Sequence, residues 1–291
     1  MSAPEGEYQG LFTGSARLGV LCAGLEIPYP HVVPVVAAFS ERLKSYFELS
    51  IDPVVPSLGV MTRGEGQAFA FRVARFMEEG GISEQGLRRF LVRAKVFEYK
   101  NIFFKVEADE RGLREYSTYF RRRPSLEVAH ACLADSGVDA EGVGLMEAVA
   151  EVLEKDTVHF LATAASRQGG LMEKVYFSQP EGAASWDRMR AAAVLADLTD
   201  ADWAPLDAHR ASLEGRTTFV SLAYANGTLL PGLKIDIHNV DPRVVRNLLT
   251  DPEQRSRADI ARASSGAEAH SYVGLGLAAG RPVRVKTYQL G

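Results

Sequence analysis

The stretch VGLMEAVAEVLEKDTVHFLATAASRQGGLMEKVYFSQP, residues 143–180, contains the unit from which the fold is predicted. Apolar residues recur at helical spacing over Val143–Leu153, and a strand-like run follows over Thr157–Ala165. A turn at Gln168–Gly170 leads into a second strand-like run, Leu171–Ser178. The unit is therefore a helix followed by a β-hairpin.

The same order of elements recurs along the chain. The other hairpins are expected at Tyr46–Ile51 with Gln67–Arg75, Asn101–Ala108 with Leu113–Arg122, Thr217–Ala225 with Leu233–Val240, and Ser271–Ala278 with Pro282–Leu290. Asn226-Gly227 is a strong hairpin signal, and Asp241 with Pro242 is typical of a helix start. Because a sheet of about ten strands would leave open edges, we expect it to close. We predict an α+β fold, a closed antiparallel barrel of five helix-hairpin repeats with its helices outside, as a single domain over residues 1–291.

The second strand of each hairpin alternates between apolar and polar side chains, which places the two kinds on opposite faces. In the fourth hairpin, for example, Leu233, Ile235 and Ile237 alternate with Lys234, Asp236 and His238. The corresponding polar positions in the other hairpins are Arg72, Tyr119, Lys174, Tyr176, Lys286 and Tyr288. Since the helices need an apolar face to pack against, the polar face is expected to line the lumen. A barrel of this size encloses a chamber.

Lysines inside a chamber require a counter-charge. Burying an ammonium group without an anion costs several kcal/mol or forces deprotonation. The lysines and tyrosines therefore predict a bound polyanion such as a diphosphate, with the tyrosine hydroxyls as further donors. The alternative is that the polar faces belong to an open sheet and face solvent.

Composition excludes several classes of protein. Hydrophobic residues make up 46% and charged residues 24%, as in ordinary globular proteins. A net charge of -4 and one short basic run, Arg121–Arg123, argue against a nucleic-acid partner. Cys22 and Cys132 are too few for a disulfide framework. Residues 1–14 lack the features of a secretion signal, and no stretch is long and apolar enough to cross a bilayer, so a cytoplasmic location without a membrane partner is expected.

With its helix-hairpin repeat, Lys174-x-Tyr176 and Lys286-x-Tyr288, the chain resembles the soluble aromatic prenyltransferases of the ABBA fold, also called the PT barrel. EKVYFSQP at 173–180 and RVKTY at 284–288 are similar to strands that bind the prenyl diphosphate in the indole (DMATS-type) members. FELS at 47–50 with AFRVARF at 70–76 is similar to the opening hairpin of the cyanobactin-type peptide prenyltransferases. The chain departs from the family pattern at Asp236, where tyrosine is usual, and at Ser117, where a basic residue is usual.

The resemblance implies an enzyme that moves an allylic isoprene, dimethylallyl or geranyl, from its diphosphate to a nucleophilic aromatic or peptide side chain, as in ribosomal peptide or indole natural-product biosynthesis. Glu48 is implied as the catalytic residue that accepts a proton or hydrogen bond from the acceptor. His238 and Asp236 are implied on the acceptor side. The residues implied to bind the diphosphate and prenyl group are Arg72, Tyr119, Lys174, Tyr176, Lys234, Tyr272, Lys286 and Tyr288.

The sequence contains no Asp-Asp-x-x-Asp segment, glycine-rich phosphate loop or Cys/His cluster. It therefore predicts no metal site and requires no cofactor, and it leaves open whether Mg²⁺ accompanies the diphosphate, with Asp236 as the carboxylate placed to hold it. The expected partners are a prenyl diphosphate and a peptide or aromatic acceptor, bound by a monomer. Two alternatives stay open: prenylation of a phenolic small molecule, and a non-catalytic barrel that binds an anionic small molecule and has no need of Glu48.

Overall fold

The computed structural model describes residues 21–43, 46–179, 184–265 and 267–290, so residues 1–14 of the expected N-terminal segment lie outside it. The strands are β1 (Phe47–Asp52), β2 (Ser57–Gly64), β3 (Ile102–Asp109), β4 (Gly112–Phe120), β5 (Phe160–Ser166), β6 (Leu171–Gln179), β7 (Thr218–Ala225), β8 (Thr228–Leu229), β9 (Leu233–Val240), β10 (His270–Leu277) and β11 (Arg284–Leu290). The helices are η1 (Tyr29–His31), α3 (Val33–Leu43), α4 (Gln67–Glu79), α5 (Glu84–Val96), α6 (Leu126–Asp135), α7 (Ala140–Val152), α8 (Ala184–Leu195), α9 (Asp200–Asp207), α10 (Arg210–Leu213), α11 (Pro242–Leu248) and α12 (Pro252–Ser265).

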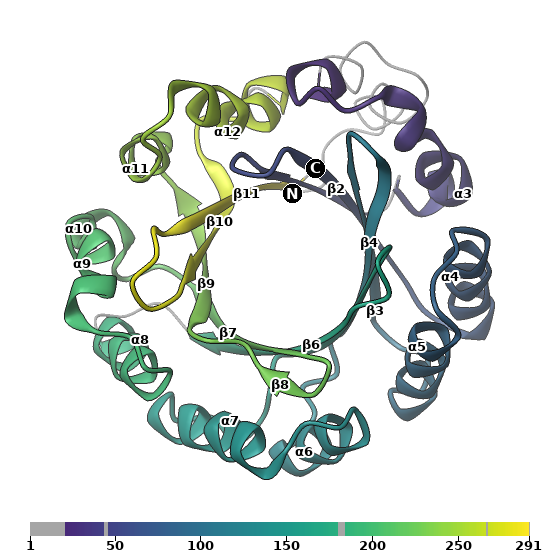
Figure 1. Ribbon diagram of the computed structural model, residues 1–291, viewed down its shortest axis with the longest axis horizontal. Coiled ribbons are helices and arrows are strands. Elements are labelled where there is room, and N and C mark those ends of the chain that lie inside the picture. Colours follow the sequence, from purple (N-terminus) through teal and green to yellow (C-terminus); the bar gives the residue numbers. More distant parts are fainter. Residues whose placement is uncertain (1–20, 44–45, 180–183, 266, 291) are drawn as a thin grey trace.

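The sheet is a closed antiparallel barrel. Its strands follow the order β6-β5-β4-β3-β2-β1-β11-β10-β9-β7, and β7 pairs back with β6 to complete the ring. The short strand β8 pairs only with β7 and lies outside the ring. Figure 1 shows the ring viewed along its axis, with the helices arranged around its outer side. The predicted barrel of helix-hairpin repeats is confirmed.

The hydrophobic core lies between the ring and the helices. Outward-facing strand residues such as Phe104, Val175, Val220, Ile235 and Val285 are at most 1% exposed. Because successive strand residues point to opposite faces, the residues between them face the lumen. The wall of the barrel therefore has an apolar outer face and a largely polar inner face, as the alternation predicts.

Local signals set several element boundaries. Asp241 accepts a hydrogen bond from the backbone N–H of Arg243, and Pro242 is the first residue of α11, as predicted. Ser83, Ser125 and Asp139 cap α5, α6 and α7 in the same way. At the predicted Asn-Gly turn, Asn226 and Gly227 both have positive φ, which glycine adopts without steric cost.

The first hairpin differs from the prediction. It consists of β1 and β2, and the segment expected as its returning strand, Gln67–Arg75, belongs to helix α4. Phe69, Val73 and Met77 are buried at helical spacing, whereas Phe71 is 57% exposed. The apparent alternation of Phe69, Phe71 and Val73 was therefore three residues of a helix read with the period of a strand.

This correction also changes the position assigned to Arg72. It lies on α4, outside the ring, and is exposed to solvent. The prediction that Arg72 faces the lumen was wrong. Among the described residues, no helix has the length and apolar character needed to cross a membrane.

Candidate functional site

Four lysines from four different strands converge in the lumen: Lys105 on β3, Lys174 on β6, Lys234 on β9 and Lys286 on β11. The ammonium groups of Lys105 and Lys234 lie 5.7 and 5.0 Å from the ring centroid of Tyr288, and Lys234 donates a hydrogen bond of 2.9 Å to its hydroxyl. The positive charge of Lys105 acts to lower the pKa of both Lys174 and Lys286, which places both of their ammonium groups within electrostatic range of Lys105. Successive hairpins therefore contribute cations to one shared interior.

Each of these lysines contacts a carboxylate. Glu107 binds Lys286 and lies 3.2 Å from Lys105, Asp236 binds Lys234, and a Glu115 oxygen lies 3.9 Å from Lys174. We call these seven side chains, four lysines and three carboxylates, the charged zone. The barrel thus supplies anions of its own, so burial of these lysines does not by itself require a bound polyanion, contrary to the sequence-based expectation.

The charged zone still carries more positive than negative charge, because its four lysines face three carboxylates. Burial lowers the pKa of Lys286 to about 8 despite its contact with Glu107. The pKa of Glu107 is held well below its usual range because Lys286, Lys105 and the Ser57 hydroxyl outweigh its burial. The excess of one positive charge favours an anionic ligand in this zone.

Glycines on neighbouring strands make room for two of the lysines. A Cβ atom on Gly274 would lie 2.5 Å from Cε of Lys234 and 2.6 Å from Oδ1 of Asp236. A Cβ atom on Gly59 would lie 2.4 Å from Cε of Lys105. The side chains of Lys234 and Lys105 therefore lie across the adjacent strand, over residues that lack a side chain.

A belt of aromatic rings surrounds the lumen next to the charged zone. Its members are Tyr46, Phe103, Tyr119, Phe160, Tyr176, Phe219, His238, Tyr272 and Tyr288. Consecutive rings contact one another with centroids between 4.0 Å (His238 and Tyr272) and 6.4 Å (Tyr272 and Tyr288). Burial raises the pKa values of Tyr176 and Tyr288 well above the usual range, so both keep hydroxyls that can donate hydrogen bonds.

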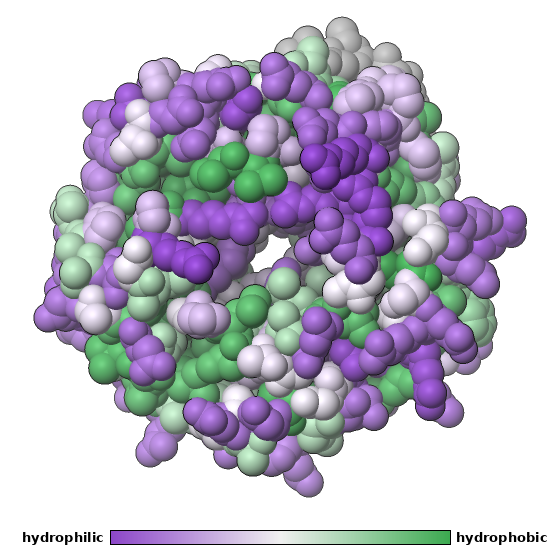
Figure 2. Space-filling model, viewed as in Figure 1, coloured by the Kyte–Doolittle hydropathy of each residue, from purple (hydrophilic) through white to green (hydrophobic). Residues whose placement is uncertain are grey.

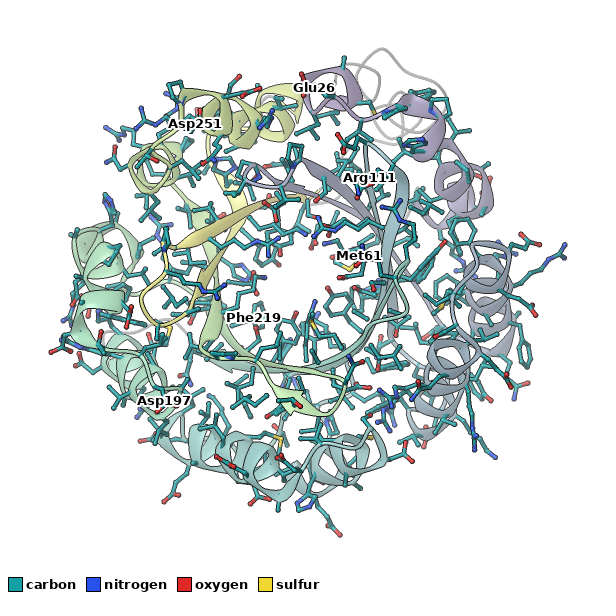
Figure 3. The ribbon with its side chains drawn as sticks, in the orientation of Figure 1. Glu26, Met61, Arg111, Asp197, Phe219 and Asp251 are labelled. Carbon is teal, nitrogen blue, oxygen red and sulfur yellow. The ribbon has the colours of Figure 1, made fainter. Side chains whose placement is uncertain are left out.

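Strand order places the belt and the charged zone at different depths. On β3, Phe103 precedes Lys105 and Glu107 on the same face, and on β6, Tyr176 follows Lys174. The charged zone thus lies toward the hairpin turns and the belt toward the ends of the strands that join the helices. In Figure 3, the labelled side chains of Met61 and Phe219 point into the lumen, and Figure 2 shows an open passage through the centre of the molecule.

Glu48 lies at the boundary between belt and charged zone. It lies on β1 two residues after Tyr46, is 8% exposed, and interacts electrostatically with Lys105, Tyr272 and Tyr288. Burial raises the pKa of Glu48 to about 7; Lys105 opposes this shift and Asp236 adds to it. Within the described residues Glu48 has no hydrogen bond or ion pair, so its carboxylate is available to a ligand.

The structure gathers most of the predicted site residues in one lumen. Lys174, Lys234, Lys286 and Asp236 belong to the charged zone, Glu48 lies beside it, and Tyr119, Tyr176, His238, Tyr272 and Tyr288 belong to the belt. Arg72 alone among them lies outside the ring. Asp236 faces Lys234, which places it deeper than His238.

Several lumen residues were not predicted from the sequence, because lumen-facing positions were assigned mainly on the second strand of each hairpin. On β3, Phe103, Lys105 and Glu107 alternate with the buried Ile102, Phe104 and Val106, so the same period-two signal was present. Glu115 on β4 and Phe219 on β7 follow from the same pattern. Among the described residues there is no group of three or more His, Cys, Asp or Glu side chains suited to a metal ion.

Comparisons with known proteins show what this barrel resembles. No protein-family model and no curated protein sequence matches the chain. The crystal structure of 5-dimethylallyltryptophan synthase from Streptomyces coelicolor is similar to it with a TM-score of 0.64 at 14% identity, over 99% of this chain and 97% of that one.

Two further solved structures agree. The ternary complex of the prenyltransferase PriB with L-tryptophan and dimethylallyl thiolodiphosphate matches with a TM-score of 0.64 at 16% identity, over 98% of this chain and 96% of that one. NotF in complex with brevianamide F and DMSPP matches with a TM-score of 0.69 at 11% identity, over 94% and 91%. At these identities the similarity establishes the fold, and the predicted resemblance to the PT barrel is confirmed at that level.

Proposed function

We propose that the protein is an aromatic prenyltransferase, which moves a dimethylallyl or geranyl group from its diphosphate to an electron-rich aromatic ring of a small molecule or peptide. The observation that carries the proposal is the position of Glu48, between an aromatic belt and a zone of excess positive charge within one lumen. The fold supports it, since the similar structures include enzymes named for dimethylallyl transfer to tryptophan.

In this proposal the charged zone binds the diphosphate. Lys174, Lys234 and Lys286 neutralise it, and the hydroxyls of Tyr176 and Tyr288 donate hydrogen bonds to it. The ligand competes with Glu107, Glu115 and Asp236 for the lysines, which exceed these carboxylates by one positive charge. Mg²⁺ that arrives with the diphosphate would strengthen its neutralisation.

The chemical step separates charge across the boundary between the two regions. The allylic C–O bond breaks, its electron pair leaves with the diphosphate, and the lysines stabilise the developing negative charge. The allylic cation that forms faces the tyrosine rings of the belt, whose electron-rich faces stabilise it and exclude water. An acceptor ring held in the belt, with His238 in its wall, then attacks the cation.

Glu48 completes the reaction by removing the proton that the new carbon–carbon bond displaces. A carboxylate with a pKa of about 7 is a stronger base than an ordinary glutamate and is still largely ionised at pH 8. We therefore expect transfer to accelerate as the pH rises through about 7.

The direct test is incubation of the protein with dimethylallyl or geranyl diphosphate and a panel of indoles, phenols and tryptophan- or tyrosine-containing peptides, with and without Mg²⁺, followed by mass detection of the added isoprene. Product formation is expected. Diphosphate binding without transfer to any acceptor would instead support the non-catalytic barrel, and the absence of both would overturn the proposal.

Glu48→Gln sharpens this test. Loss of a positioned base lowers the rate of transfer about 10²–10⁴-fold and removes the rise with pH. The free energy of unfolding changes with pH in the opposite direction to the activity. Because folding raises the pKa of Glu48 to about 7, the wild-type protein loses stability as the pH rises toward and through 7. Glu48→Gln is therefore expected to be more stable than wild type at pH 8 but not at pH 4. Equal activity in both proteins would exclude Glu48 as the base.

A further inference from the structure

A second cationic cluster lies at the end of the lumen where the strands join the helices, outside the charged zone. Arg63 near the end of β2 and Arg121, Arg122 and Arg123 just after β4 line a cavity of about 350 Å³ together with Asn101 and Phe103. We call the four arginines the arginine rim. All four are exposed to solvent.

The arginine rim has few carboxylates of its own. Arg122 donates to Glu98 at 3.2 Å, and Glu98 also pairs with Lys100. Arg63, Arg121 and Arg123 have no ion pair among the described residues. Their positive field reaches inward, because Arg121 and Arg123 add to the burial that lowers the pKa of His159 to about 4. A guanidinium cluster of this kind suits a carboxylate, which it can bind through paired N–H donors.

The belt holds two of these guanidiniums in place. Arg63 lies 5.7 Å from the ring centroid of Tyr46 and 5.9 Å from that of Phe103, and Arg121 lies 5.8 Å from that of Phe160. The rim therefore lies directly over the belt. Arg63 pairs with Phe103, two residues along the strand from the Met61–Lys105 pair, and Arg121 lies four residues beyond Ser117, which pairs with Lys105. About 7 Å of strand therefore separates Arg63 from the level of Lys105, and about 13 Å separates Arg121 from it.

We infer that the arginine rim binds a carboxylate of the aromatic acceptor, whose ring lies in the belt and presents its reacting carbon to Glu48 and the charged zone. This inference rests on the proposed prenyl transfer and names the acceptor class. The acceptor is an aromatic compound or peptide whose carboxylate reaches the arginine rim while its reacting ring lies in the belt. The rim suits the acceptor better than the diphosphate, because an allylic cation formed among solvent-exposed arginines would be captured by water.

The test compares two probes that differ only in charge, N-acetyl-L-tryptophan and N-acetyl-L-tryptophanamide, by calorimetric titration. Wild type is expected to bind the carboxylate at least ~10-fold more tightly than the amide. The double variant Arg63→Gln/Arg121→Gln is expected to lose this preference and to bind the amide as wild type does. Arg111→Gln, which removes an exposed arginine in the β3–β4 turn (labelled in Figure 3), is expected to keep the preference.

Other results would overturn the inference. It fails if wild type binds neither probe, if it does not prefer the carboxylate, or if the double variant keeps the preference. It also fails if the double variant loses affinity for inorganic diphosphate, since the rim would then hold the donor. Because these titrations involve no transfer, they separate failure of the rim from failure of the proposed function, which shows instead as absence of product in the mass assay.

Discussion

Glu173 and Lys174 are neighbours on β6, yet they lie on opposite faces of the barrel wall and in opposite kinds of environment. Glu173 points outward and is 2% exposed. It accepts hydrogen bonds from Ser136 and Thr163, both 2.9 Å, and lies 3.4 Å from Arg89. Lys174 points inward, and within the part of the chain that the structure describes its one carboxylate contact is Glu115, 3.9 Å away.

The outer cluster is linked by hydrogen bonds between its own members. Arg93, 2% exposed, donates to the carbonyl oxygen of Cys132 and to Ser136, whose hydroxyl donates in turn to Glu173. Glu173 and Arg93 each have several partners from α5, α6 and the strands, so the cluster joins these helices to the barrel. The inner charges also pair with one another, and Glu107 alone contacts Ser57, Lys105, Arg114 and Lys286, but they line an open passage. Access to the lumen, more than burial or pairing, therefore distinguishes ligand-binding from structural charge in this protein.

The largest expected effect is on the outer face. Arg93→Met removes the buried guanidinium that donates to the Cys132 carbonyl oxygen and to the Ser136 hydroxyl, and it is expected to lower the free energy of unfolding by about 3–5 kcal/mol, the sum of two hydrogen bonds to a charged group. Urea denaturation followed by circular dichroism measures it, and Arg88→Met, an exposed arginine on the same helix, is the control. A loss below about 1 kcal/mol would show that the outer cluster is not structural.

Lys174→Met tests the inner face. We expect affinity for inorganic diphosphate to fall by about 1.5 kcal/mol, roughly tenfold, because a charged contact is lost. The free energy of unfolding should change by no more than about 1 kcal/mol, since the contact with Glu115 is long. Lys95→Met on the outer helix α5 is the control for binding. Unchanged diphosphate affinity in Lys174→Met would contradict a ligand-binding role for the inner face.

A smaller effect is expected from Gly274→Ala. The new methyl group would crowd Lys234 and Asp236, and displacing these flexible side chains should weaken diphosphate binding by about 1 kcal/mol. Gly276→Ala is a matched control on the same strand and face, because its nearest neighbouring atom, Cβ of Arg284, would lie 3.5 Å away. If the two variants bind alike, the position of Lys234 does not depend on the gap at Gly274.

The smallest effect is expected from Arg72→Gln. Its side chain is exposed on α4, so the free energy of unfolding should stay within about 0.5 kcal/mol of wild type and diphosphate affinity should not change. Titration with inorganic diphosphate checks this. A clear loss of diphosphate affinity would show that Arg72 contributes to the binding site and would contradict its assignment to the outer surface.

Sequence reasoning located four of the five hairpins to within a few residues, because alternation and turn residues such as Asn226-Gly227 act locally. It failed at the first hairpin because Phe69, Phe71 and Val73 satisfy a strand pattern over a short window, and only the burial of Ala70, Ala74 and Met77 distinguishes a helix. It placed the predicted site residues other than Arg72 on the lumen side, since the side on which a strand residue lies follows from its parity.

The sequence by itself determined the repeat, the hairpins and which side chains share a face of each strand, because these depend on short-range periodicity and turn chemistry. Only the tertiary structure decided which charges meet. Ring closure brings Lys286 of the last strand to Glu107 of the third and Arg284 to Asp52 of the first, pairs far apart in the chain. Their contact depends on strand order and register around the whole ring, which no local pattern encodes.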